Sequence, residues 1–344
     1  MSVRESYRSG HQTGFTLVEL MVAVALTVIL STTVFGTLFS MQQGYKVQLN
    51  YAEAQQNARA VLAVVRDAVR WSGYGFVDDV ATQGVVPLGD CFDTGTPANS
   101  TFACDNADNG SDRIRVRYGS GTAEAVYQAA WQTQNAGSYI EIQPSLPGHP
   151  IAANSLVFVS GTCAGGGATA TNIVQITGDT PGANGFSHNY SYTPATGLDC
   201  SNFESGFSTG LVTVADFFID DTTDPDHPRL MRRINAATGG TAQVVAYDIE
   251  DLQVQFGIDT NSPKDDVVDV WCDDINDTTA CSTGFTTREN ALRTTAVRIA
   301  VVTRTRTPIP DRVSSGVTVQ NHTIPGGDGH RRWIYRTTVA LRNN

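Results

Sequence analysis

The sequence predicts an α+β protein in which one long N-terminal helix packs on an antiparallel, β-rich head. Three observations support this fold class: an apolar segment over residues 15–39, a helical pattern that continues to about Trp71, and short β-rich runs separated by turn-forming residues from position 74 onward. The chain has 344 residues. Residues 1–73 hold the N-terminal segment and the predicted helix. About 270 residues follow them, enough for one large domain or two small domains with a true core.

The apolar segment is long enough to cross a membrane. As a helix, Phe15 to Phe39 would extend about 37 Å, against about 30 Å for the hydrocarbon core of a bilayer. Glu19 is the only charged residue between Arg8 and Lys46. Because an unpaired carboxylate in a bilayer is unfavourable by a few kcal/mol, we expect Glu19 to have water or a cation within reach.

The second half of the predicted helix, within residues 40–73, is amphipathic. Its apolar residues recur every three or four positions, so they share one helix face, which we expect to pack on the head. Ser72 and Gly73 are typical of a helix end. The apolar positions are Val47, Tyr51, Ala54, Ala58, Val61, Val65 and Val69.

Residues 74–344 form the predicted head, which would hold at least eight strands in antiparallel sheets. The clearest alternation of polar and apolar residues covers 113–118, as in a half-buried strand. The other predicted strands are 156–159, 173–176, 211–219, 243–247, 252–258, 295–303 and 333–341. Long loops are predicted at 81–112, 160–172, 180–209 and 259–290.

The six cysteines all follow the apolar segment, and none forms a Cys-x-x-Cys motif. Disulfides in an oxidising compartment are therefore favoured over a zinc site. Spacing suggests bridges between sequence neighbours, although other pairings stay open. The suggested pairs are Cys91 with Cys104, Cys163 with Cys200, and Cys272 with Cys281.

The heptapeptide Gly14-Phe15-Thr16-Leu17-Val18-Glu19-Leu20 resembles the type III signal of type IV prepilins and pseudopilins. The resemblance implies a leader over residues 1–14, cleavage after Gly14 by a prepilin peptidase on the cytoplasmic side, and N-methylation of Phe15. Glu19 would be the fifth residue of the mature chain. An excess of arginine over glutamate in the leader fits a cytoplasmic position.

The expected role of Glu19 follows from charge. After cleavage, Phe15 carries a terminal amine, which becomes a buried cation in a filament, and Glu19 of a neighbouring subunit could neutralise it. The alternative is a simple signal anchor whose Glu19 reaches the membrane interface. An ordinary secretory signal peptide is disfavoured because its apolar region is shorter and its cleavage site follows that region.

Four C-terminal stretches resemble successive strands of PilW-type minor pilins: 228–233, 249–260, 296–302 and 331–343. The resemblance implies a low-abundance subunit that helps to initiate type IV pilus assembly near the tip. It implies other minor pilins, the major pilin, the prepilin peptidase and the inner-membrane assembly machinery as partners. It also implies a periplasmic head before assembly and a pilus location afterwards. Residues 77–210 are not covered by the resemblance.

Two alternative functions remain. A type II secretion pseudopilin of the J type would share the helix and its processing, and a tip adhesin or DNA-uptake factor would use the loops as a binding surface. The formal net charge of −11, or −12 without the leader, disfavours general nucleic-acid binding. The late arginines are interpreted as solvent-facing strand residues: Arg304, Arg306, Arg331, Arg332 and Arg336.

The sequence does not predict an enzyme. Residues 206–210 match Gly-x-Ser-x-Gly, but a nucleophile elbow needs a following helix, and a strand is predicted there. The histidines at 149, 188, 227, 322 and 330 form no metal-ligand pair of the HxxxH kind. No cofactor is expected, although acidic turns at 220–226 and 273–277 offer oxygen ligands for calcium.

Overall fold

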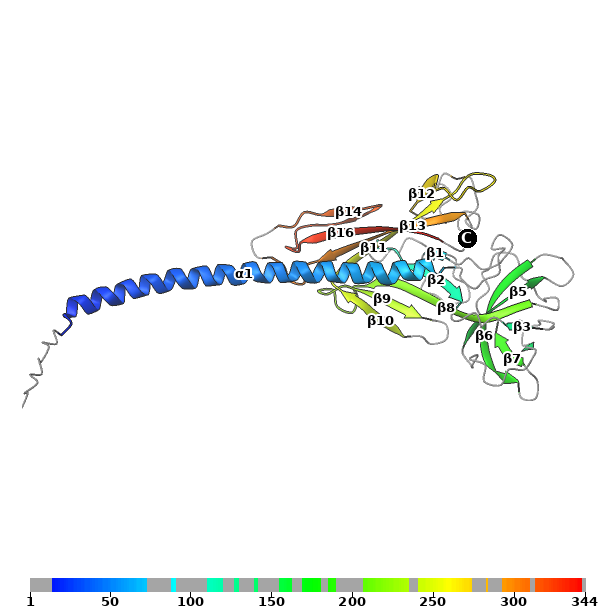
Figure 1. The fold of residues 1–344 in the computed structure, drawn as a ribbon, viewed down its shortest axis with the longest axis horizontal. Helices are drawn as coiled ribbons and strands as arrows, with labels where there is room; N and C mark the ends of the chain where they lie inside the picture. Colours follow the sequence, from blue (N-terminus) through cyan, green and yellow to red (C-terminus); the bar gives the residue numbers. More distant parts are fainter. Residues whose placement is uncertain are drawn as a thin grey trace, which may run out of the picture. The chain divides into compact units, whose positions relative to one another are not determined.

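We describe a computed structural model of the chain, shown in Figure 1. The residues described are 14–72, 88–90, 110–119, 127–129, 139–141, 155–162, 169–180, 185–189, 207–234, 241–273, 283, 293–309 and 313–341. They contain one helix and sixteen strands, and the strands pair antiparallel, so the predicted α+β class is confirmed. The chain divides into two compact units, Met1–Ala52 and Glu53–Asn344.

Helix α1 covers Leu17–Arg70. In the first unit its apolar side chains are exposed, as is Phe15 just before it, at 90%. By length and composition the helix could span a membrane. Its threonine hydroxyls donate to carbonyls three or four residues earlier, so their polar groups are satisfied within the helix, as an apolar surrounding requires. These are Thr27, Thr32, Thr33 and Thr37.

The apolar face predicted on the second half of α1 is confirmed within the second unit. The apolar positions Ala54, Ala58, Val61, Val65 and Val69 are all buried. The predicted burial was wrong for the two apolar positions in the first unit, since Val47 is only half-buried and Tyr51 is exposed. The first part of α1 is the only helix or strand in the described part of the first unit, so no other element of that unit covers these side chains.

The larger sheet has the strand order β1-β2-β8-β5-β6-β7-β4, with β3 also paired to β8 and with β9 and β10 added beyond β8. Its centre is β8 (Phe207–Asp220), whose first part pairs with β3 and β5 and whose second part pairs with β2 and β9. Figure 1 shows β8 running between these two groups of strands. The other strands are β1 (Leu88–Asp90), β2 (Ile114–Gly119), β3 (Tyr127–Ala129), β4 (Tyr139–Glu141), β5 (Leu156–Thr162), β6 (Thr169–Thr180), β7 (Gly185–Asn189), β9 (Arg229–Ile234) and β10 (Ala242–Tyr247).

The second sheet has four strands in the order β12-β11-β13-β16. They are β12 (Val270–Cys272), β11 (Ile249–Ile258), β13 (Thr294–Arg304) and β16 (Arg332–Ala340). The hairpin of β14 (Val317–Val319) and β15 (His322–Ile324) packs Val319 and Ile324 against Ala300 and Val302 of β13. Because alternate β13 residues face opposite sides, this strand is buried on both faces.

The main core joins α1 to both sheets. Val61, Val65 and Val69 of the helix belong to the same apolar cluster as Phe217 of β8 and Phe256 of β11. Each of these side chains is fully buried. The second unit is therefore held together by one continuous core that includes the last part of α1.

The eight predicted strands all exist, but the predicted loops were wrong in part. Strands β1, β7 and β12 lie inside the predicted loops, and β6 and β8 begin earlier than predicted. Apart from β12 (Val-Trp-Cys), these segments are polar or glycine-containing, so their composition resembles loops, while sheet pairing makes them strands.

Candidate functional site

The N-terminus of α1 is closed by a reciprocal pair of side chains. The Glu19 carboxylate accepts hydrogen bonds from the backbone N–H and the hydroxyl of Thr16, both at 3.0 Å. In return, the backbone N–H of Glu19 donates to the Thr16 hydroxyl at 3.2 Å. This is a capping box, in which Thr16 is the N-cap and Glu19 is the third helical residue.

The capping box leaves half of the Glu19 carboxylate unused. Both donated bonds end on Oε2, and Oε1 accepts no hydrogen bond from the described residues. Gly14, Phe15 and Glu19 are all exposed and lie within six consecutive positions of the chain. An amine at Phe15 or on another molecule could therefore approach Oε1 without breaking the cap.

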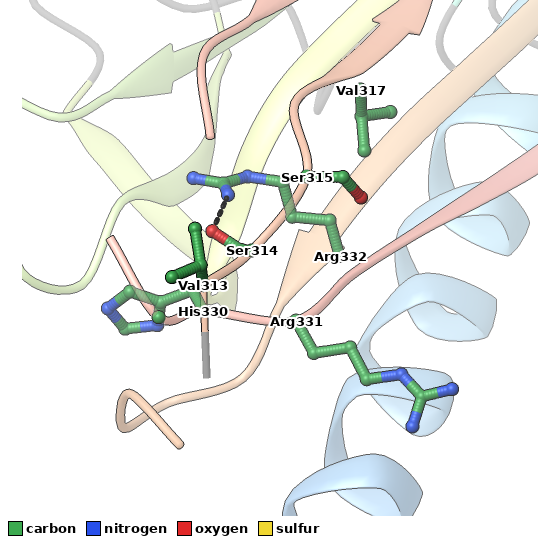
Figure 2. A pocket seen from close by; sticks show the side chains of 8 residues that line it. Val313, Ser314, Ser315, Val317, His330, Arg331 and Arg332 are labelled. Atoms are coloured by element: carbon green, nitrogen blue, oxygen red, sulfur yellow. Dashed lines mark hydrogen bonds between the residues drawn. The ribbon is translucent and has the colours of Figure 1, made fainter. Parts of the chain in front are cut away.

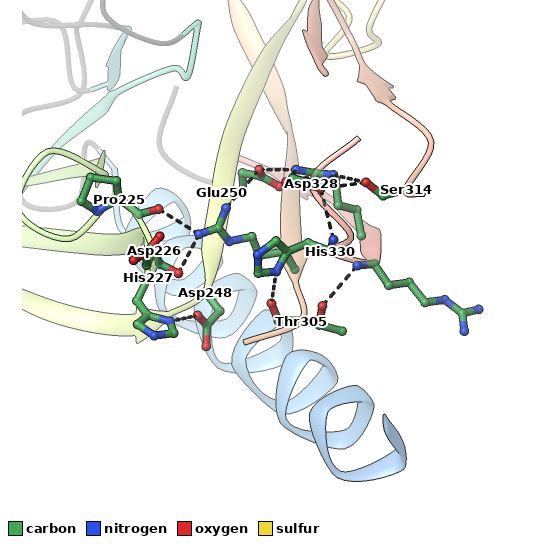
Figure 3. A network of polar contacts seen from close by, with 12 residues as sticks. Pro225, Asp226, His227, Asp248, Glu250, Thr305, Ser314, Asp328 and His330 are labelled. Carbon is green, nitrogen blue, oxygen red and sulfur yellow. Dashed lines mark hydrogen bonds and ion pairs between the residues drawn. The ribbon is translucent and has the colours of Figure 1, made fainter. Parts of the chain in front are cut away.

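A second cluster of functional groups lies where β11, β16 and the segment before β16 meet (Figure 3). The guanidinium of Arg332 forms a bidentate pair with Glu250, at 2.6 and 2.7 Å. It also donates to Asp328 at 3.0 Å. The Arg332 side chain is only 2% exposed, so this is a nearly dry ion pair.

The electrostatics of the cluster follow from these contacts. Burial alone would raise the pKa of Asp328, but hydrogen bonds from Arg332, Ser314 and the backbone of His330 hold it well below its usual range. Burial would lower the pKa of Arg332, but the bonds to Glu250 and Asp328 raise it further above its ordinary value. Both groups therefore stay charged at neutral pH.

Arg304 extends the same network to the turn before β9. Its Nη2 donates to the carbonyls of Pro225 and Asp226 at 2.9 and 2.7 Å, and its Nη1 lies 3.6 Å from Glu250. Nearby, the ring of His330 contacts the Thr305 carbonyl at 2.6 Å. The second sheet is thus connected to the β8–β9 turn of the larger sheet by polar contacts as well as by the core.

A cavity of about 320 Å³ lies beside this network, lined by residues 313–315, 317 and 329–332. Figure 2 shows Arg332 reaching Ser314 and Arg331 extending away from the other labelled side chains. Arg332 is already bound by Glu250 and Asp328. The buried charge of Arg332 is therefore already compensated. The groups of the described lining that are left for an occupant include hydroxyls and backbone groups.

The first of the two acidic turns considered for calcium, 220–226, uses the carboxylate of Asp220 locally. Asp220 accepts bonds from Thr222, Thr223 and Arg229, and these bonds outweigh burial and lower its pKa far below the usual value. Within the residues that the structure describes, no group of three or more Asp, Glu, His or Cys is arranged to hold a metal ion. Most of 273–277 lies outside that part of the chain.

The loop after β11 is organised by Asp259. Its buried carboxylate accepts backbone N–H groups of Asn261, Asp265 and Asp266 at 2.8–2.9 Å. Burial would raise the pKa of Asp259, but these three bonds and the charge of Arg293 lower it. Asp259 thus acts as an acceptor for the loop backbone.

The serine motif does not form a nucleophile elbow in the described residues. Ser208 lies inside β8 and pairs with Gln128 and Ser160 on neighbouring strands. His227 contacts Asp248 at 2.9 Å and His322 contacts Asp251 at 3.0 Å, on different elements. His149 lies outside the described part of the chain.

Of the disulfide candidates, Cys272 is buried and disulfide-bonded. Cys91, Cys104, Cys163, Cys200 and Cys281 lie outside the described residues, so the three pairings stay predictions. The sequence reasoning missed Thr16 as the partner of Glu19. The motif Thr-x-x-Glu ahead of an apolar run is a known helix-start signature and could have identified it.

A long exposed apolar helix with a capped N-terminus, followed by an antiparallel head built around the end of that helix, defines a type IV pilin-like protein. Residues 10–35 match the prokaryotic N-terminal methylation motif. Residues 216–343 match the type IV pilus-assembly protein W family, PilW. Together the two matches support a prepilin-like protein of the PilW type. Comparisons with curated proteins and with solved structures find no match.

Proposed function

We propose that this protein is a minor pilin, cleaved between Gly14 and Phe15 by a prepilin peptidase and N-methylated on Phe15. The observation that carries the proposal is the capped N-terminus of an exposed apolar helix, because Glu19 keeps Oε1 available beside Phe15. The match to the methylation motif over residues 10–35 supports the same assignment. In the inner membrane the apolar half of α1 anchors the precursor, with the head in the periplasm.

In the filament, the Phe15 amine of one subunit pairs with Glu19 of a neighbour, since both charges would otherwise be buried alone. The head then takes part in initiating the pilus, in a complex with other minor pilins at the tip. The PilW match over 216–343 favours the pilus over a type II secretion pseudopilin.

A deletion mutant that lacks this protein distinguishes a role in the type IV pilus from a role in type II secretion. The proposal expects loss of surface pili with protein secretion intact. Loss of secretion with pili intact would instead support the pseudopilin.

A further inference from the structure

We infer that the outer face of β8, β9 and β10, next to Arg113, is a docking surface for another pilus subunit that presents a carboxylate between apolar side chains. The inference rests on the proposed function. We call this surface the Phe218 face and define it by Phe218, Val244, Tyr247, Arg113 and Arg233.

Strand register places these residues on one face. Phe218 pairs with Met231 of β9, which pairs with Val244 of β10. Their sequence neighbours Phe217 and Leu230 belong to the main core. Because side chains alternate along a strand, the row Phe218, Met231 and Val244 points away from that core. Met231, in the middle of the row, is buried, Phe218 is half-buried and Val244 is exposed.

The apolar part of the face is accessible where it reaches β10. Val244 is 37% exposed and Tyr247, which pairs with Arg229 beyond a bulge, is 51% exposed. Within the described residues β10 pairs only with β9, and it contains no charged residue or proline. Native edge strands usually carry such residues as protection, so an uncharged edge with exposed apolar side chains is suited to a partner.

Two arginines flank Phe218 and give the face its charge. The guanidinium carbons of Arg113 and Arg233 lie 5.5 and 5.6 Å from the centre of the Phe218 ring. Arg233 is 3.5 Å from Asp216, but Asp216 is already paired with the buried Arg115. The face therefore carries more positive than negative charge.

Arg113 is the residue that points to a missing partner. It has no hydrogen bond or ion pair to the described residues, and its Nε is buried without an acceptor, as is the Nε of Arg233. A buried polar group without a partner is unfavourable. A carboxylate placed beside the two guanidinium groups would compensate their charge through charge-assisted hydrogen bonds. Aromatic and Arg side chains are also among the types enriched in protein interfaces.

The experiment places a photo-crosslinking residue, p-benzoylphenylalanine, at Tyr247 of the full chain in cells that assemble pili. We expect an adduct with another pilus subunit, identified by mass. The matched control position is Val313, which is 85% exposed and lies outside the Phe218 face. There we expect no such adduct.

Charge reversal tests the role of Arg113. Arg113→Glu should lower the adduct yield about tenfold, because it replaces an attractive contact with a repulsive one. Val244→Glu, at an exposed edge position where folding is not at risk, should also lower the yield. Arg66→Glu, a reversal on the exposed face of α1, should leave it unchanged.

Equal yields at positions 247 and 313, or a yield that neither Arg113→Glu nor Val244→Glu changes, would overturn the inference. An adduct with anything other than a pilus subunit would also overturn it. If the chain begins at Phe15 in pili but forms no adduct at position 247, the inference that the Phe218 face is a docking surface is wrong and the proposed function stands. If the chain is unprocessed and absent from pili, both the docking inference and the proposed function are wrong.

Discussion

The carboxylate of Glu19 binds Thr16 through one oxygen and leaves the other unbound by the described residues. The helix cap and the proposed charge pairing therefore use different parts of one side chain. Glutamine keeps a carbonyl oxygen for the cap but has no charge, so substitutions can separate the two roles.

Glu19→Gln and Glu19→Ala should both prevent incorporation into pili, because neither can neutralise the Phe15 amine. The head should unfold at the wild-type temperature in both variants, since its core begins at Ala54. Immunoblots of sheared filaments and of membranes measure incorporation. Thr16→Ala is the matched control: it weakens the cap by about 1 kcal/mol but keeps the charge. It should still enter pili, and normal incorporation of Glu19→Gln would contradict charge pairing.

Arg332→Ala should strongly destabilise the head. Removing one partner of a buried ion pair costs about 3 kcal/mol, because Glu250 is left without its bidentate partner. Denaturant unfolding of the full chain in detergent measures the free energy. Arg336→Ala, at an exposed position of the same strand, should change it by less than about 0.5 kcal/mol. Equal effects of the two substitutions would mean that the network with Glu250 adds no stability.

Gly110→Ala should disturb the contact between His322 and Asp251. Gly110 has φ of +73°, and an added Cβ would lie 2.5 Å from the His322 ring. We expect destabilisation of about 1–2 kcal/mol from the strained backbone and the displaced ring. Denaturant unfolding measures the loss, and a stability equal to wild type would show that the ring moves aside freely.

Acid should destabilise the head through its bound carboxylates. The pKa values of Asp220, Asp259 and Asp328 are lowered in the folded protein. Their contribution is therefore complete above the unfolded-state pKa of about 4 and is lost as pH falls from there toward the folded values. Melting temperatures of the full chain between pH 7 and pH 2 test this. Asp328→Asn should reduce stability at pH 7 and flatten the acid decline, and an unchanged decline would contradict the assignment.

The sequence was informative where one physical pattern dominated. The spacing of Ala54, Ala58 and Val61 reports a buried helix face, and the β-branched run in β13 reports a buried strand. Segments such as β7, Gly-Phe-Ser-His-Asn, carry no such pattern. Their strand conformation comes from pairing with β6 and β4, which sequence periodicity does not record.

The candidate sites divide in the same way. Gly14, Phe15 and Glu19 lie within six consecutive positions, so a local motif could identify them. Phe218 and Val244 lie on different strands and Arg113 lies just before β2, so the three come together only through sheet register. Their shared face could not be predicted without the register, since a shift of one residue would turn each side chain to the opposite side.

The most direct test of the minor-pilin account is the intact mass and N-terminal sequence of the protein from sheared surface filaments and, separately, from membranes. The account predicts a filament chain that begins at N-methyl-Phe15 and has the mass expected for three disulfides. A chain that still begins at Met1 and occurs only in membranes would contradict it and leave a signal anchor with a periplasmic head.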